Sequence, residues 1–276
     1  MESLTPPQKE RALDRLLAEM GSVVVAFSGG VDSAYLAVRA HRVLPTRSLA
    51  VTADSPSLAE AQRAQARDLA RDFGFPHRLV RTEEFENPLY TRNAPDRCYH
   101  CKVELFRHLL PLAAREGYAH VAYGLIVDDL AEFRPGHGAA AEAGVRSPLA
   151  EAGLNKAEVR LLSRALGLPT WDRPASPCLS SRVPYGTAVT PEVLRRVERA
   201  EEGLRALGFS ELRVRHFGER ARVEIAPREM ARLEEEGMRR AVETAVRAAG
   251  YAEATIDPRG YQRGRLNPGP DPLTPL

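Results

Sequence analysis

Three cysteines and one glycine-rich turn are the residues of this sequence whose types and spacing can do chemistry. Cys98 and Cys101 stand three positions apart, and Cys178 lies far along the chain. Three thiolates can hold three corners of a [4Fe–4S] cluster and leave one iron open to an outside ligand such as hydrosulfide. An odd, closely spaced set does not suit a secreted disulfide framework, so cytosolic metal or thiol chemistry is favoured.

Other uses of the cysteines stay open at this point. The thiols could act through a thiol or persulfide mechanism without a cluster, or they could bind zinc or be inert. A structural zinc takes four protein ligands, and His100 stands between Cys98 and Cys101, where it is poorly placed to help them. A thioredoxin-like pair should open the helix after the first strand of its own fold, whereas this CxxC falls in a segment that we expect to be a loop.

The glycine-rich turn is Ser-Gly-Gly-Val-Asp-Ser, and its candidate ligand-binding residues are Ser28, Gly29, Gly30, Asp32 and Ser33. Paired glycines let the backbone approach a phosphate, and a helix N-terminus offers unpaired N–H donors. No lysine follows, so the turn differs from the GxxxxGK[ST] loop. It resembles the PP-loop of the ATP pyrophosphatases. That resemblance implies binding of ATP through its pyrophosphate portion, with Mg²⁺ as the accompanying ion, and reaction at the α-phosphate.

The segments that position these residues alternate between strands and helices. This order predicts an α/β fold with a parallel sheet covered by helices on both faces, and such sheets bind ligands at the carboxyl ends of their strands. Long irregular segments are expected over 82–101 and 124–148, where sites usually lie. The predicted strands are 22–27, 48–53, 77–81 and 120–123, and the predicted helices are 32–44, 57–73 and 102–116.

A second, smaller domain follows. Asn155–Glu158 has the pattern of a capping box at a helix start, and Asp172–Pro177 breaks regular structure. We therefore expect a PP-loop domain over 1–173 and a C-terminal α+β domain over 174–276, with a proline-rich tail from Gly264. In the second domain the predicted helices are 190–207, 227–236 and 239–249, and the predicted strands are 212–217, 222–225 and 252–256.

Length and charge narrow the choice of partner. The 276 residues are 43% apolar, and 39 basic against 37 acidic residues give a net charge of +2 with no basic block. A small charged ligand fits this balance better than a nucleic acid or a membrane surface does. The N-terminal pattern is that of an amphipathic helix without an export signal, so a cytoplasmic protein is expected. Only Lys9, Lys102 and Lys156 among the basic residues are lysine.

Several blocks together resemble the LarE sulfur transferases, which build the nickel-pincer cofactor of lactate racemase. The resemblance covers about residues 10 to 265, and CLSSRVPYG is its most specific part. It implies adenylation of a carboxylate of pyridinium-3,5-biscarboxylic acid mononucleotide, followed by substitution of sulfur for oxygen. The blocks that carry it are SGGVDS, RCYHCK, YGLIVDDLAEFRPG, LGLPTWDRPASPCLSSRVPYG, VERAEEGLRALGF and LRVRHFGERARVEI.

The same resemblance assigns roles to individual residues. Some family members have only the cysteine that matches Cys178 and sacrifice its sulfur, whereas members with all three cysteines are thought to hold a cluster and turn over repeatedly. This sequence has all three. Sulfide or another sulfur donor and a homo-oligomer, such as a hexamer, are implied as partners. The PP-loop resemblance places Asp54 and Gly124 near the nucleotide, and the LarE resemblance places Glu201, Arg213 and Arg215 in the sulfur-transfer pocket.

Arg182 and Lys102 are two further candidate site residues, and both are close in sequence to a cysteine. Arg182 belongs to the CLSSR block, and Lys102, directly after Cys101, is a compact positive charge that could meet ATP phosphate or the acyl-adenylate. The plain alternative for each of these charged residues is a solvated surface position. Asp128 and Asp129 could bind Mg²⁺ or cap the next segment, and capping is favoured.

Proteins with other functions also contain this loop. A tRNA thiolase of the PP-loop class with a three-cysteine cluster is the nearest alternative, but it predicts a basic groove or an RNA-binding domain that the sequence does not display. An ammonia-dependent ligase would need no cysteines. A zinc-stabilised nucleotide-binding regulator would show no turnover.

Overall fold

The computed structural model describes residues 4–130, 135–174 and 176–262. The proline-rich tail predicted from Gly264 and parts of two of the blocks quoted above lie outside these ranges. The chain divides into two compact units: residues up to Glu84 with Cys98–Ser176, and Phe85–Arg97 with residues from Pro177 onward. Within the described ranges no helix combines the length and apolar character needed to cross a bilayer.

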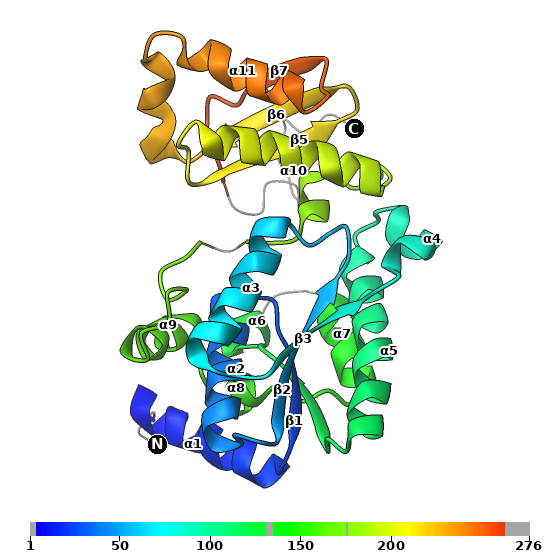
Figure 1. Cartoon of the computed structure of the whole chain (residues 1–276), viewed down its shortest axis with the longest axis vertical. Coiled ribbons are helices and arrows are strands. Elements are labelled where there is room, and N and C mark those ends of the chain that lie inside the picture. The colour runs from blue at the N-terminus through cyan, green and yellow to red at the C-terminus, as the bar shows by residue number, and fades with distance from the viewer. Residues whose placement is uncertain (1–3, 131–134, 175, 263–276) are drawn as a thin grey trace. The chain divides into compact units, whose positions relative to one another are not determined.

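The first unit is built on a parallel four-stranded sheet in the order β3-β2-β1-β4 (Figure 1). Strand β1 is central, because Val24 pairs with Leu49 of β2 on one side and Val121 of β4 on the other. This confirms the predicted parallel α/β fold. The strands are β1 Val23–Ala26, β2 Ser48–Asp54, β3 His77–Arg81 and β4 His120–Tyr123.

Helices cover both faces of this sheet. Val23 and Val25 of β1 belong to one apolar core, and Val24 and Ala26 belong to another on the opposite face. A strand buried on both faces has no polar alternation, which explains the run of valines. The first core takes side chains from α1 Pro6–Met20, α2 Val31–Val43, α3 Glu60–Phe73, α8 Pro148–Glu151 and α9 Lys156–Ala165, and the second from α5 Arg97–Glu116 and α7 Pro135–Glu142.

The expectation of a loop around the CxxC pair is wrong. Helix α5 begins at Arg97, so Cys98 and Cys101 lie in its opening turns. No glycine or proline stands between Arg97 and Pro111 to end the helix, and its period extends back through both cysteines. The segments expected to be irregular also contain η1 Glu84–Glu86, α4 Pro88–Thr91 and α6 Val127–Leu130.

Helix α9 begins as predicted. The Asn155 side chain accepts a hydrogen bond from the Glu158 backbone N–H, and the Glu158 carboxylate accepts one from the Asn155 N–H, each at 2.9 Å. This reciprocal pair satisfies two donors that a helix start leaves open. Gly167, which follows α9, has the positive φ of 74° that suits a helix end.

The second unit holds a three-stranded sheet in the order β5-β6-β7. Strand β5 pairs antiparallel with β6, and β7 joins β6 in parallel. The predicted helix over 227–236 is instead a 3₁₀ helix, η3 Pro227–Glu234. The other elements are η2 Leu179–Arg182, α10 Pro191–Ala206, β5 Leu212–Phe217, β6 Arg220–Ile225, α11 Met238–Ala248 and β7 Glu253–Ile256.

Residues 85–97 group with this second unit, although the sequence analysis assigned them to the PP-loop domain. Hydrogen bonds of Asn93 join this segment to the second unit. Its side-chain amide donates to three carbonyl groups there, those of Val183, Pro184 and Thr187. The Tyr90 hydroxyl also lies 2.8 Å from the Ser180 hydroxyl. These contacts join residues about ninety positions apart, which no local pattern can indicate.

Candidate active site

The turn between β1 and α2 is closed by its own serines. Ser33 Oγ lies 3.1 Å from Ser28 Oγ, accepts from the Ser28 N–H at 3.2 Å and lies 3.2 Å from the Gly30 carbonyl oxygen. Gly29 has a φ of 73°, which an L side chain rarely adopts. Gly30 caps α2, so the open N–H groups of the helix face the turn. The arrangement is suited to an anion.

Gly124 lies directly against this turn. A Cβ atom at Gly124 would lie 2.9 Å from Ser33 N and 3.1 Å from Asp32 C, both of which are backbone atoms. The residue must therefore be glycine for β4 and α2 to approach as they do. Gln65 of α3 adds a second contact, because its side-chain amide donates to the Gly29 carbonyl at 2.7 Å.

Two acidic residues at this sheet edge, Asp32 and Asp54, each have a basic partner. Lys156 Nζ lies 2.5 Å from Asp32 Oδ2, and Arg63 donates twice to Asp54 Oδ1, at 2.6 and 2.9 Å. Burial raises the pKa of Asp32, and the Lys156 ammonium opposes that rise. Asp32 Oδ1 is buried and has no hydrogen-bond partner among the described residues.

Asp128 and Asp129 act as caps. Asp128 accepts from the Lys156 N–H at 2.7 Å, and Asp129 accepts from the Ile126 N–H at 3.3 Å. These hydrogen bonds to backbone N–H groups fit the capping interpretation of this pair.

Lys102 lies among aromatic rings close to the CxxC pair. Its ammonium is 5.8 Å from the centre of the Phe106 ring and 5.3 Å from that of Tyr123. Burial lowers the pKa of Lys102, while Cys101 and Cys98 act in the opposite direction. The positive charge is therefore placed where it favours the thiolate form of its neighbours.

The second unit places Cys178 at the start of a short, tightly held turn. The Cys178 carbonyl accepts from the Ser181 N–H and from Arg182 Nη1, each at 3.0 Å. Arg182 also donates to the Pro177 carbonyl at 2.6 Å. Only 2% of Arg182 is exposed, and its other nitrogens bind both oxygens of Glu201.

Glu201 is a buried carboxylate that several groups of this unit bind. It accepts from Arg182, from Arg205 at 2.8 Å and from the Val214 N–H at 3.2 Å. Burial alone would raise the pKa of Glu201, but the guanidinium groups of Arg182, Arg213 and Arg205 outweigh it and lower the pKa to about 2. The carboxylate is thus held ionised inside the protein.

Arg213 and Arg215 differ in their surroundings. Arg215 donates to Glu224 at 2.9 Å and to the Ser181 carbonyl at 3.0 Å, so it holds the turn after Cys178 to the sheet. Arg213 donates to the Leu212 carbonyl and lies over the Tyr261 ring at 4.8 Å. Burial, together with the nearby Arg182, lowers the pKa of Arg213.

Comparison with known proteins gives this geometry a context. Residues 10–98 match the family model described as asparagine synthase, which includes the Ser28–Ser33 turn. An uncharacterized protein of Synechocystis is 45% identical over 92% of this chain and 95% of its own length. Pyridinium-3,5-bisthiocarboxylic acid mononucleotide synthase of Lactiplantibacillus plantarum is 35% identical over 94% of each chain.

The chain belongs to the LarE family of ATP-dependent sulfur transferases. The resemblance found in the sequence motifs is thereby confirmed, and the matched length includes both units. The Ser28–Ser33 turn lies within the segment that matches the family model and has the sequence pattern of a PP-loop, so it is called the PP-loop below.

Lys156, Gln65 and Glu224 were missed by the sequence analysis. Lys156 was named as one of three lysines, but nothing near it in sequence connects it to Asp32. Gln65 and Glu224 carry no motif, and only the packing of α3 and β6 shows what they bind.

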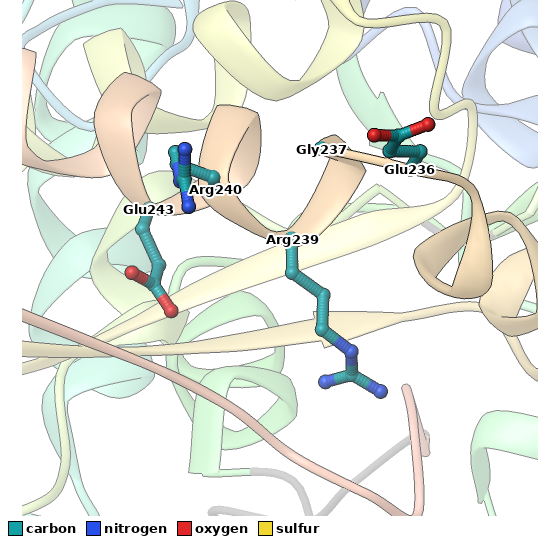
Figure 2. A pocket seen from close by; sticks show the side chains of 5 residues that line it. All are labelled: Glu236, Gly237, Arg239, Arg240 and Glu243. Carbon is teal, nitrogen blue, oxygen red and sulfur yellow. The ribbon is translucent and has the colours of Figure 1, made fainter.

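Two further features, a cluster of potential metal ligands and a hollow, do not include any of the candidate site residues. Glu83, Glu104 and His108 bring potential metal ligands within 4.8 Å of one another, but Arg107 donates to both carboxylates and occupies the place of a cation. A hollow lies at the start of α11, and Figure 2 shows that the side chains of Arg239 and Arg240, which line it, point in different directions. Its lining residues are Glu236, Gly237, Arg239, Arg240 and Glu243.

We expect Gly124→Ala to destabilise the enzyme by about 1–3 kcal/mol, because the new methyl group meets backbone that cannot turn aside. Gly138→Ala is the matched control, since a Cβ at Gly138 has no neighbour closer than 3.9 Å. It should be neutral or stabilising in helix α7. Urea unfolding of both variants measures the difference, and equal effects would contradict the close approach.

Glu201→Gln should lower stability at pH 7 by about 3 kcal/mol, because it leaves buried arginine charge uncompensated. The pKa of Glu201 is depressed from 4.5 to about 2, so its stabilisation is present above pH 4.5 and is lost as the pH falls toward 2. The variant and wild type should therefore converge at low pH. Glu219→Gln, at a side chain that is 77% exposed, is the control and should change stability by less than about 0.5 kcal/mol. A constant gap across the pH range would refute the assignment.

Proposed function

We propose that this enzyme converts a carboxylate of pyridinium-3,5-biscarboxylic acid mononucleotide to a thiocarboxylate. The carboxylate attacks the α-phosphorus of ATP and pyrophosphate leaves; sulfur then attacks the acyl carbon and AMP leaves. The observation that carries this proposal is the 35% identity, over 94% of both chains, to a synthase named for the bisthiocarboxylic product.

The PP-loop is proposed to bind the pyrophosphate portion of ATP. Its support is the pair of glycines and the N-terminus of α2, which offers N–H donors without side chains in the way. Asp32 is the residue that we expect to hold Mg²⁺, because carboxylate oxygens suit that ion and Oδ1 lacks a protein partner among the described residues. When bound, the ion would offset the charge of the phosphates.

We propose that Cys98, Cys101 and Cys178 hold a [4Fe–4S] cluster. Cys98 and Cys101 are one helical turn apart on α5 and share a face, which fits two thiolates of one metal centre. Three thiolates would leave one iron for sulfide delivered by an outside donor. Such chemistry suits the cytoplasm, where thiols stay reduced. The homo-oligomer implied by the family resemblance is part of the same proposal.

The second unit is proposed to deliver sulfur. Arg213 is the candidate for contact with the substrate's carboxylate or phosphate, since guanidinium groups bind both in a planar, two-pronged manner. Arg182, Glu201 and Arg215 support this role differently: their contacts hold the backbone of the Cys178 turn in place. Lys102 is proposed to meet the acyl-adenylate or a phosphate of ATP.

Mass spectrometry tests the reaction. Purified enzyme incubated anaerobically with ATP, Mg²⁺, sulfide and the pyridinium mononucleotide should yield the substrate with one oxygen exchanged for sulfur, together with AMP and pyrophosphate. Omitting ATP should abolish the exchange. AMP and pyrophosphate formed without any sulfur-containing product would overturn the proposed transfer.

Iron analysis tests the cluster separately. Anaerobically purified protein should be brown and hold about four iron atoms per chain. Replacing Cys98, Cys101 or Cys178 with serine should remove the colour and most of the iron, whereas His100→Ala should keep both. Colourless wild-type protein that still thiolates the substrate would refute the cluster and leave the reaction intact.

A further inference from the structure

A lysine far away in sequence lies at the PP-loop. Lys156 is the first residue of α9, and its ammonium binds the carboxylate of Asp32, which is 124 positions earlier in the chain. Asp32 is the second residue of α2, two positions after Gly30, which caps this helix. The Lys156 side chain is 36% exposed, so a ligand of the loop can reach its ammonium.

The backbone of Lys156 is held firmly. Its N–H donates to Asp128 at 2.7 Å, and the capping box of Asn155 and Glu158 fixes the surrounding turn. Glu158 is in turn bound by Lys9 of α1 at 2.7 Å. The base of the side chain is therefore fixed, and the flexible stem positions the charge.

A positive charge beside Asp32 favours an anion at the loop. An anion that binds at the start of α2 meets the negative charge of Asp32, which repels phosphate. Loops of the GxxxxGK[ST] type carry a lysine within the motif, and Ser28–Ser33 has none. An ammonium has three N–H donors, and Asp32 is the one acceptor that the described residues give to Lys156.

We propose that Lys156 binds the phosphates of ATP and that Asp32 holds its ammonium beside the loop when no nucleotide is bound. This inference rests on the proposed use of the PP-loop for ATP. It assigns to α9 the phosphate-binding charge that the loop itself lacks. The competing possibility is that Lys156 acts only through Asp32, by cancelling its charge.

A double-mutant cycle separates the two roles. ATP binding is measured by calorimetry in EDTA, so that metal bound to Asp32 does not contribute. Lys156→Met should weaken binding by about tenfold or more both in the wild-type background and in Asp32→Asn, because the lost contact is with the phosphate itself. Lys156→Arg keeps the charge and should recover most of the affinity. If Lys156→Met has no effect in the Asp32→Asn background, the ligand role is overturned.

Lys9→Met is the matched control. It also removes an ammonium–carboxylate contact that anchors α9, but Lys9 binds Glu158 and not Asp32. It should bind ATP with wild-type affinity, and melting temperatures show whether each variant is folded. An equal loss of affinity in Lys9→Met would reduce Lys156 to an anchor of α9. Absence of ATP binding in the wild type would instead refute the proposed nucleotide site itself.

Discussion

The contact between Gly124 and the backbone of Asp32 and Ser33 is the constraint on which the PP-loop depends. Strand β1 pairs in register with β4, so the ends of both strands arrive at the same edge of the sheet. A side chain at Gly124 would push the start of α2 away from that edge. The loop can then close on its own serines and leave the helix N–H groups open. An anion that binds at this turn meets backbone N–H groups, and the side chains adjust the local charge.

Ion pairs between buried or partly buried side chains occur in both units. Asp54 is bound by Arg63, Glu201 by Arg182 and Glu224 by Arg215. Removing such groups from water costs several kcal/mol for each ion, and the cost is offset only when each charge has a partner and good hydrogen bonds. Because the partners come from different elements, each pair also fixes the position of the strand or turn that carries it. The turn of Cys178 is held in this way from two sides, by Arg182 and by Arg215.

The local sequence patterns predicted most of the fold and part of the candidate site. β3, β4 and β5 have the predicted bounds, because each is a short segment with apolar residues between turn signals, a local pattern that depends on no distant contact. The CxxC pair was misplaced although Pro95 and Asp96, residue types typical of a helix start, directly precede α5. Residues 85–97 could not be assigned, since Asn93 binds carbonyl groups about ninety positions away. Motifs identified the PP-loop, but the partners of its charges are set by tertiary packing.

The three lysines show how packing completes what motifs begin. In a chain that otherwise uses arginine for its positive charges, Lys102 lies between aromatic rings beside Cys98 and Cys101, and Lys156 binds Asp32. Lys9 binds Glu158, whose carboxylate also accepts the Asn155 N–H that begins α9. A continuous set of contacts thus runs from α1 through the start of α9 to the PP-loop. An ammonium is a compact point charge on a flexible stem, whereas a guanidinium is a planar fork that needs matching acceptors. Lysine suits these positions because it places a compact charge at the end of a flexible side chain.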